Sequence, residues 1–167
     1  MASLKQAFGT TANLTITLAS LAESNTFIAG RQSTAVDNTV NLYLDYLLSG
    51  KITVGTTPTV GTEIRVYVVG LLDDSTWPDT LGAVDAAASI TSVGVGSAFL
   101  KLAATMVVDA ATSNRTYYFG PVSVAQLFGG VLPRKFLVYV SQNTDVNLNS
   151  TGSNHQITVT PSYNTAA

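Results

Sequence analysis

The side chains that most often carry out chemistry are sparse in this chain. Its 167 residues include one histidine, His155, and no cysteine. A nucleophilic triad would need that histidine between a carboxylate and a serine, and no Gly-x-Ser-x-Gly elbow presents such a serine. A zinc site would need further histidine or cysteine ligands. We therefore predict a non-enzymatic protein without cofactor or metal, in which His155 is a surface or loop residue.

Carboxylates are the other group with chemical potential. Four of them fall close together in the segment 73–85. Carboxylates and loop carbonyls are the ligands that calcium prefers, so a calcium loop is one hypothesis. The spacing does not match an EF-hand and no bidentate glutamate closes the loop, which favours a solvated acidic loop. The members of this group are Asp73, Asp74, Asp79 and Asp85.

Charge is low over the whole chain. Charged residues make up 11% of it, against roughly 25% in typical soluble domains, and threonine, serine, asparagine and glycine take their place. A surface poor in charge loses its water at little cost, which suits lasting contact with other proteins. The net charge is −2 and the eight basic residues are scattered, which predicts no nucleic-acid partner. No apolar stretch is long enough to span a bilayer, which predicts no membrane partner.

Strand patterns recur along the sequence. Short runs of β-branched and aromatic residues, several with period-two alternation, are separated by turn residues. The third run is predicted to continue through 51–54, with Ser49 and Gly50 as a bulge or tight turn. Gly120-Pro121 is predicted to stop one strand, and Pro161 to mark the edge or end of the last. The predicted strands are 13–18, 26–29, 41–48, 63–70, 99–108, 115–119, 135–141 and 156–161.

Other segments lack such periodicity. Residues 55–61 read as a loop, and 72–97 is the least regular part of the chain. Short helical turns are predicted at 83–88 and at 123–130, the second with Ser123 as its N-cap. The first eleven residues show little alternation, which predicts either an extended N-terminal arm or a frayed terminus.

Strands without long helical crossovers predict one fold class. The chain is expected to be all-β: a two-sheet antiparallel sandwich, jelly-roll-like, with about eight strands and at most short helical turns. Its length fits a single domain over residues 1–167.

Parts of the sequence resemble small virion proteins of tailed bacteriophages. In the C-terminal stretch a proline precedes a hydrophobic strand at 132–144, followed by a Thr-Gly turn at 147–152. The segments 36–45 and 61–68 are similar in style. The resemblance implies a capsid decoration (cement) protein with a jelly-roll or related fold. Such a protein binds the major capsid protein on the capsid exterior, associates as a homodimer or homotrimer, and is made in the host cytoplasm without a signal peptide.

The resemblance supplies no motif that assigns binding residues. Contact with partners is therefore predicted where long connections leave the sandwich, in the loops 55–61 and 73–79. The alternative function is a carbohydrate-binding β-sandwich module of a phage tail or fibre, with Trp77 and tyrosines stacking on sugar rings. The candidate contact residues are Thr57, Pro58, Asp74, Trp77 and Asp79.

Overall fold

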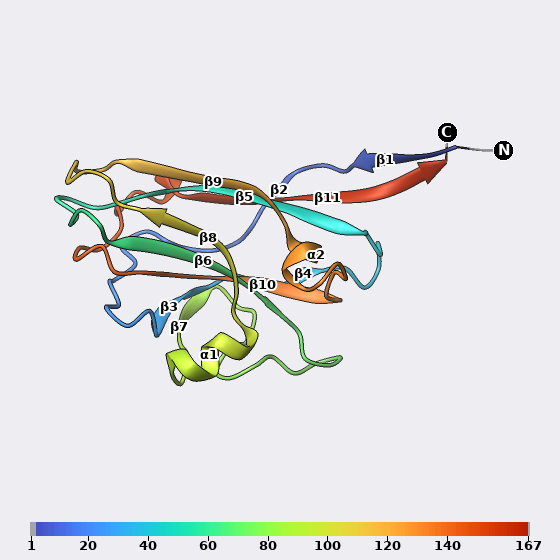
Figure 1. Ribbon diagram of the computed structural model, residues 1–167, viewed down its shortest axis with the longest axis horizontal. Helices are drawn as coiled ribbons and strands as arrows, with labels where there is room; N and C mark the ends of the chain where they lie inside the picture. Colours follow the sequence, from blue (N-terminus) through green and yellow to red (C-terminus); the bar gives the residue numbers. More distant parts are fainter. Residues whose placement is uncertain (1–2, 167) are drawn as a thin grey trace.

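Two antiparallel sheets face each other in the computed structural model, which describes residues 3–166 (Figure 1). In the first sheet, two short strands lie end to end along one side of β11, and β5 and β9 follow on its other side. The strands of this sheet are β1 (Leu4–Phe8), β2 (Ala12–Asn13), β11 (Gln156–Ala166), β5 (Asp45–Thr53) and β9 (Thr116–Ser123).

The second sheet is centred on β10. Two short strands, β3 and β4, pair with one side of it, and β6 and then β8 lie on the other, while β7 extends the sheet beyond β3. Its strands are β7 (Ala86–Ser89), β3 (Ala29–Gln32), β4 (Val36–Asp37), β10 (Lys135–Gln142), β6 (Glu63–Gly70) and β8 (Lys101–Val107).

The chain visits these strands in jelly-roll order. If β1 and β2 count as one broken strand, and β3 and β4 as another, eight strands remain besides β7. Numbered along the chain, they lie as 1-8-3-6 in one sheet and 2-7-4-5 in the other. This is the double Greek key of a jelly roll. The predicted all-β, jelly-roll-like sandwich of about eight strands is confirmed.

The main core fills the space between the sheets. Side chains of a strand alternate between its two faces, so every second residue of β6 points inward. Ile64, Val66 and Val68 are fully buried there, opposite Leu48 and Ile52 of β5. The period-two pattern of the sequence is therefore the pattern of the core.

A second, smaller core lies on the outer face of the β10 sheet. The long connection from β6 to β8 folds back over that face and carries β7 and the helix α1 (Val93–Phe99). It buries Leu137 and Tyr139, and the hydroxyl of Tyr139 donates to the carbonyl of Ile28 at 2.6 Å. Because β10 is covered on both faces, it reads as a continuous apolar run.

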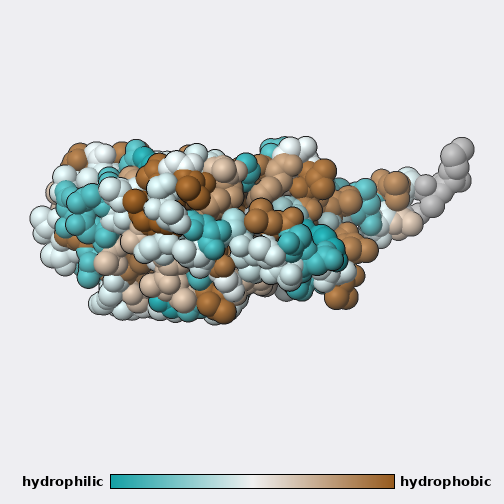
Figure 2. All heavy atoms as spheres, turned by 90° about the horizontal axis from the view of Figure 1, so that it is seen from below, coloured by the Kyte–Doolittle hydropathy of each residue, from teal (hydrophilic) through white to brown (hydrophobic). Residues whose placement is uncertain are grey.

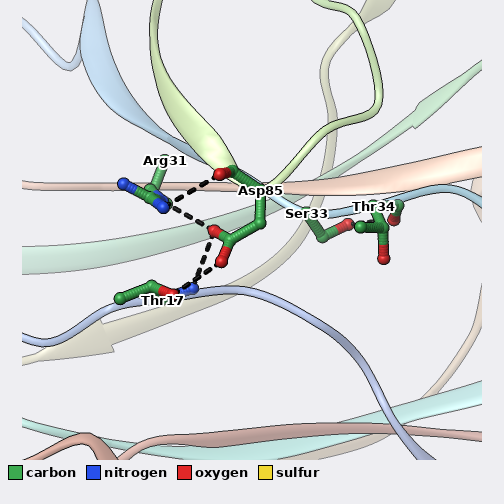
Figure 3. A network of polar contacts seen from close by, with 5 residues as sticks. All are labelled: Thr17, Arg31, Ser33, Thr34 and Asp85. Carbon is green, nitrogen blue, oxygen red and sulfur yellow. Dashed lines mark hydrogen bonds and ion pairs between the residues drawn. The ribbon is translucent and has the colours of Figure 1, made fainter.

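An ion pair fastens this covering layer to the sandwich (Figure 3). The Asp85 carboxylate accepts from Arg31 Nε at 2.7 Å, and from the backbone N–H and hydroxyl of Thr17 at 2.9 and 2.6 Å. Burial alone would raise the pKa of the Asp85 carboxyl, but these hydrogen bonds outweigh it and hold that pKa below its ordinary value. Three separate segments thus meet at one carboxylate.

The covering layer is where the sequence prediction failed. The helical turn predicted at 83–88 is wrong, because Ala86–Ser89 is an edge strand paired with β3. The helix α1 was not predicted, since its two glycines are poor helix formers. Ser92 caps it by accepting from the N–H of Val95.

Several strand boundaries also differ from the prediction. The strand predicted at 99–108 is Lys101–Val107, because Phe99 ends α1. The second strand begins at Ala29 and not at residue 26, and the third begins at Asp45 and not at 41. Of the first, predicted at 13–18, only Asn13 pairs in a ladder, as the second residue of β2; residues 14–18 keep the alternating burial without a ladder. The third strand does continue to Thr53, and the register of its pairing with β9 shifts between Leu48 and Gly50, which confirms the predicted irregularity.

Neither predicted proline stop occurs. β9 runs through Gly120 and Pro121 to Ser123, because these two residues bulge out opposite the same register shift in β5. β11 continues past Pro161 to Ala166. The Pro161 carbonyl accepts from Gly9, in the gap between β1 and β2, so the N–H that proline lacks would face an interrupted partner.

The remaining helical segments are short. The predicted turn after Ser123 is confirmed as α2 (Val124–Leu127), with the Ser123 hydroxyl accepting from the N–H of Gln126 at 3.2 Å. Gly129 and Gly130 follow it with positive φ. A single 3-10 turn, Gly152–Asn154, precedes β11. No helix of residues 3–166 is long and apolar enough to cross a membrane.

Candidate functional site

The connections leave the sandwich at two opposite ends (Figure 1). The loop end, at the left of the figure, gathers the connections β2–β3, β5–β6, β8–β9 and β10–β11. The ribbon end, at the right, gathers β4–β5 and β9–β10, the start of the β6–β7 connection, and strand β1 beside the last residues of β11. β10 runs from the ribbon end to the loop end.

Two of the predicted contact residues lie at the loop end. Thr57 is exposed, and its backbone N–H donates to the Ser113 hydroxyl at 3.0 Å. Pro58 is buried, so it has little surface to offer a partner. The next residue, Thr59, donates its N–H to the carbonyl of Thr144, just beyond the end of β10. The loop is folded against its neighbours and does not reach outward.

The other three lie elsewhere. Asp74 is exposed and forms an ion pair with Arg134, just before the start of β10. Trp77 is half-buried and packs against the second core, so only part of its surface faces solvent. Asp79 is exposed and accepts from the N–H and hydroxyl of Thr91, both at 2.6 Å. The two predicted contact loops are therefore at opposite ends of β10 and do not form one surface.

The four aspartates of the acidic segment each bind a different group of the protein. Asp73 accepts from the N–H groups of Ser75 and Thr76, which lowers the pKa of its carboxyl. Asp74, Asp79 and Asp85 hold Arg134, Thr91 and Arg31, as described above. Within residues 3–166, no three carboxylate or imidazole groups converge as a metal-binding cluster.

His155 holds the loop end together. Its Nε2 lies 2.8 Å from the carbonyl of Asn149, and its Nδ1 accepts from the N–H of Thr53 at 3.4 Å. Burial lowers the pKa of this imidazole, and Lys51 lowers it further, although the bond to Asn149 acts the other way. The residue is half-buried beside a loop, and its neutral form fits both partners.

A polar hollow of about 430 Å³ also lies at the loop end. It is lined mainly by asparagine, serine and backbone groups, and the amide of Asn149 donates to that of Asn114 at 2.7 Å. None of its lining residues is aromatic or charged. The hollow can accept hydrogen-bonding groups, but no carboxylate, imidazole or amine lines it to activate one of its hydroxyls.

The ribbon end differs in shape, because a two-stranded ribbon projects from it (Figure 1). β5 pairs with β11 only as far as Ser162, whereas β1 pairs with β11 from Ser162 to Ala166. The paired segments Leu4–Ala7 and Tyr163–Ala166 therefore extend beyond the sandwich; we call them, with Phe8, the terminal ribbon.

A chain of aromatic rings anchors the base of the terminal ribbon. Tyr163 packs against Tyr43, which meets Tyr46 edge-on, and Tyr46 meets Phe136 in the core, at centroid distances of 5.6, 5.6 and 5.4 Å. Such contacts add to the stability that burial alone supplies. The ribbon thus leaves the body at a fixed point.

Exposed apolar side chains gather at the ribbon end. Of fourteen large apolar side chains exposed among the described residues, seven lie there. Figure 2 shows apolar atoms along this end and at the base of the projecting ribbon. Five of these seven side chains belong to loops, and we call this group of five the apolar end. The seven are Leu4 and Phe8 of the ribbon, with Val40, Leu42, Leu44, Leu72 and Val131 of the apolar end.

The apolar end carries little free charge. No charged residue occurs in 38–44 or 128–133, which supply four of its five side chains. Of the charged residues that flank them, Lys135 pairs with Asp37 at 2.8 Å and Arg134 pairs with Asp74, while the Asp45 carboxylate accepts from the N–H of Ala125 at 2.7 Å. A surface that is apolar, uncharged and exposed is typical of a protein contact.

No protein-family model, curated protein or solved structure matches this chain. The projecting ribbon and the exposed, uncharged apolar side chains make the ribbon end the candidate functional site. Sequence reasoning reaches only part of it: it predicts an extended arm or a frayed terminus in the first eleven residues, of which 4–8 is a strand paired with β11. The pairing is not predicted, because 4–8 lacks alternation and Pro161 hides the continuation of β11. The available signal was the uncharged run Val40-Asn41-Leu42-Tyr43-Leu44, which was read as strand.

Proposed function

We propose that this protein is a non-enzymatic capsid decoration (cement) protein of a tailed bacteriophage, which binds the outer surface of the shell through its apolar end. The observation that carries the proposal is the cluster of exposed, uncharged apolar side chains at one end of a rigid jelly roll. Jelly rolls occur in viral capsid proteins, in lectins and in cupins. The phage-like sequence style supports the first of these.

The energetics of such a surface suit a cement. Burying one valine or leucine side chain contributes about 1.5–3 kcal/mol. Val40 and Leu42, at 85% and 72% exposed, have most of that still to gain. Each copy then adds a modest interface, and repetition over a symmetric shell multiplies it.

The test is cryo-electron microscopy of virions from the phage that encodes this chain, with and without it. We expect jelly-roll density on the shell exterior and a lower temperature of genome release in particles that lack the protein. Adding back the purified protein should restore both. Virions whose shell lacks the chain would reject the proposal.

The apolar end is tested with a matched pair of variants. Val40→Asp with Leu42→Asp should weaken binding to depleted particles by roughly a hundredfold, because two apolar burials of over 1.4 kcal/mol each are lost. Val60→Asp, at an exposed position of the loop end, should leave binding unchanged. If only Val60→Asp impairs binding, the contact surface is at the loop end and the assignment to the apolar end is wrong.

The second candidate, a carbohydrate-binding module, draws support from the polar hollow at the loop end. Its asparagine amides are groups that hydrogen-bond sugars well. No aromatic ring lines it, and Trp77 packs elsewhere. A glycan array with Asn147→Ala as the control variant separates the two functions: a ligand lost in that variant would favour this one.

A further inference from the structure

The free edge of the terminal ribbon points to a partner. We propose that β1 pairs antiparallel with β1 of a second copy of this chain, about a two-fold axis at Gln6, so that the first sheets of two molecules join into one. This homodimer would form in the free protein, so it can be tested independently of binding to a shell.

The backbone groups of β1 that are free to pair with another strand are those that do not face β11. The N–H of Gly9 donates to the carbonyl of Pro161 at 2.9 Å, so Gly9 faces β11. Backbone groups alternate in direction along a strand, so Ala7 and Lys5 face β11 as well. The N–H and C=O groups of Leu4, Gln6 and Phe8 therefore point to the other side, where no strand of residues 3–166 lies.

These three residues are self-complementary. Leu4 and Phe8 lie symmetrically about Gln6, so a two-fold axis there places Leu4 opposite Phe8 of the second copy, and Gln6 opposite its own copy. All three pairs then have both backbone groups aimed at each other, which gives six hydrogen bonds between the chains. A contact related by a two-fold axis is satisfied in both copies at once.

The side chains fit the same register. Alternate residues share a face of the ribbon, so Leu4 and Phe8 of both copies lie on one face, and each exposed leucine meets an exposed phenylalanine. They are 75% and 56% exposed in the single chain. Lys5, the one charged residue of the ribbon, falls opposite Ala7, so no like charges are placed directly opposite each other.

Other sheet edges are less able to accept a strand. Proteins protect edges with proline, bulges or short strands. β9 bulges at Pro121, the pairing of β8 with β6 shifts register, and β7 has four residues. β1 has neither proline nor a register shift over its five paired residues. A two-stranded ribbon alone is also only marginally stable, and pairing makes it four-stranded.

The size of the contact sets the expected strength. Five residues a side bury less than the roughly 800 Å² per partner of a standard interface. We therefore expect a reversible dimer that dissociates on dilution. Analytical ultracentrifugation over about 1–500 µM is the measurement, and a wild-type monomer throughout, or a trimer, would overturn the proposal.

Charge reversal tests the register. One chain carries Leu4→Lys with Phe8→Lys, and another carries Leu4→Glu with Phe8→Glu. Each alone should be monomeric, because like charges face across the axis. A 1:1 mixture should form a heterodimer, because each introduced lysine then meets an introduced glutamate. A mixture that stays monomeric, or single variants that stay dimeric, would contradict the pairing.

A second pair of variants tests the backbone bonds. Gln6→Pro removes an N–H that points away from β11, so it should abolish the dimer and leave the melting temperature of the body unchanged. Gln6→Thr keeps that N–H and should remain dimeric. Leu102→Lys, at an exposed position on β8, controls for added charge and should not alter the dimer. Persistence of the dimer in Gln6→Pro would refute β1 pairing.

Discussion

Replacing Asp85 by asparagine tests how the covering layer is held. The carboxylate accepts three hydrogen bonds from Arg31 and Thr17, and the side chains of Asp85 and Arg31 are only 19% and 24% exposed. Bonds to charged groups contribute about 1.5–3 kcal/mol each, and asparagine keeps part of the acceptor capacity. We expect Asp85→Asn to lower the free energy of unfolding by about 2–3 kcal/mol at pH 7. The melting temperature should fall by about 4–12 °C.

The pH dependence of that loss is diagnostic. Because the pKa of Asp85 is lower in the fold than its ordinary value near 3.8, the ionised carboxylate stabilises the protein above that pH. The contribution disappears as the pH falls through the native pKa. Urea unfolding at several pH values should therefore show wild type and Asp85→Asn converging below about pH 4.

A control separates this ion pair from surface pairs. Asp109 pairs with Arg115 at 2.8 Å, but their side chains are 58% and 42% exposed. Asp109→Asn should change the unfolding free energy by less than about 1 kcal/mol. If the loss in Asp85→Asn is the same at pH 3 and pH 7, or no larger than in the control, the carboxylate does not hold the layer.

Two further predictions concern single positions. Because the pKa of His155 is lowered in the fold, protonation favours the unfolded chain, and the free energy of unfolding should decline as the pH falls below about 6.5. Urea titrations should show no such decline in His155→Gln. If the decline persists in that variant, other groups cause it. Gly120→Ala should cost more than about 2 kcal/mol, because φ is +91° and a Cβ would lie 2.4 Å from the carbonyl of Leu48; Gly152→Ala, where a Cβ meets nothing within 4 Å, should cost less than about 1 kcal/mol, and equal melting temperatures for the two variants would refute the argument.

The central strands were predictable from the sequence because burial dictates their pattern. β6 matches its predicted range residue for residue, since its apolar positions alternate without interruption. β10 extends its predicted range by a single residue, because its centre, Phe136 to Val140, is a continuous apolar run covered on both faces. In both strands the local sequence pattern agrees with the packing, and this agreement makes a strand recognisable from the sequence.

The edge strands were not predictable, because distant residues determine them. Ala86–Ser89 has a composition that suits a helix, yet it pairs with β3 over the second core. β3 can in turn lie against β10 because position 30 is glycine, where a Cβ would lie 2.3 Å from the carbonyl of Val140. Such a close approach depends on the tertiary fold, so it produces no periodic pattern in the sequence.

The location of the candidate site was not predictable from the sequence. Low charge indicated association, and loops were the reasonable location. Loop length does not reveal exposure, however. Pro58 is buried and Trp77 half-buried, because their loops fold against neighbouring segments, whereas Val40 and Leu42 stay exposed in a segment that reads as strand.

The distribution of charge links the composition of the chain to its candidate site. All four arginines form ion pairs, with Asp85, Glu63, Asp109 and Asp74. Because each arginine is matched by a carboxylate, these pairs contribute little net charge to the surface. The ribbon is left with Lys5, and the loop segments 38–44 and 128–133 with no charge. The association proposed above would therefore rest on hydrophobic burial and backbone pairing. Both are available at the ribbon end: the apolar end offers hydrophobic burial, and the free edge of β1 offers backbone pairing.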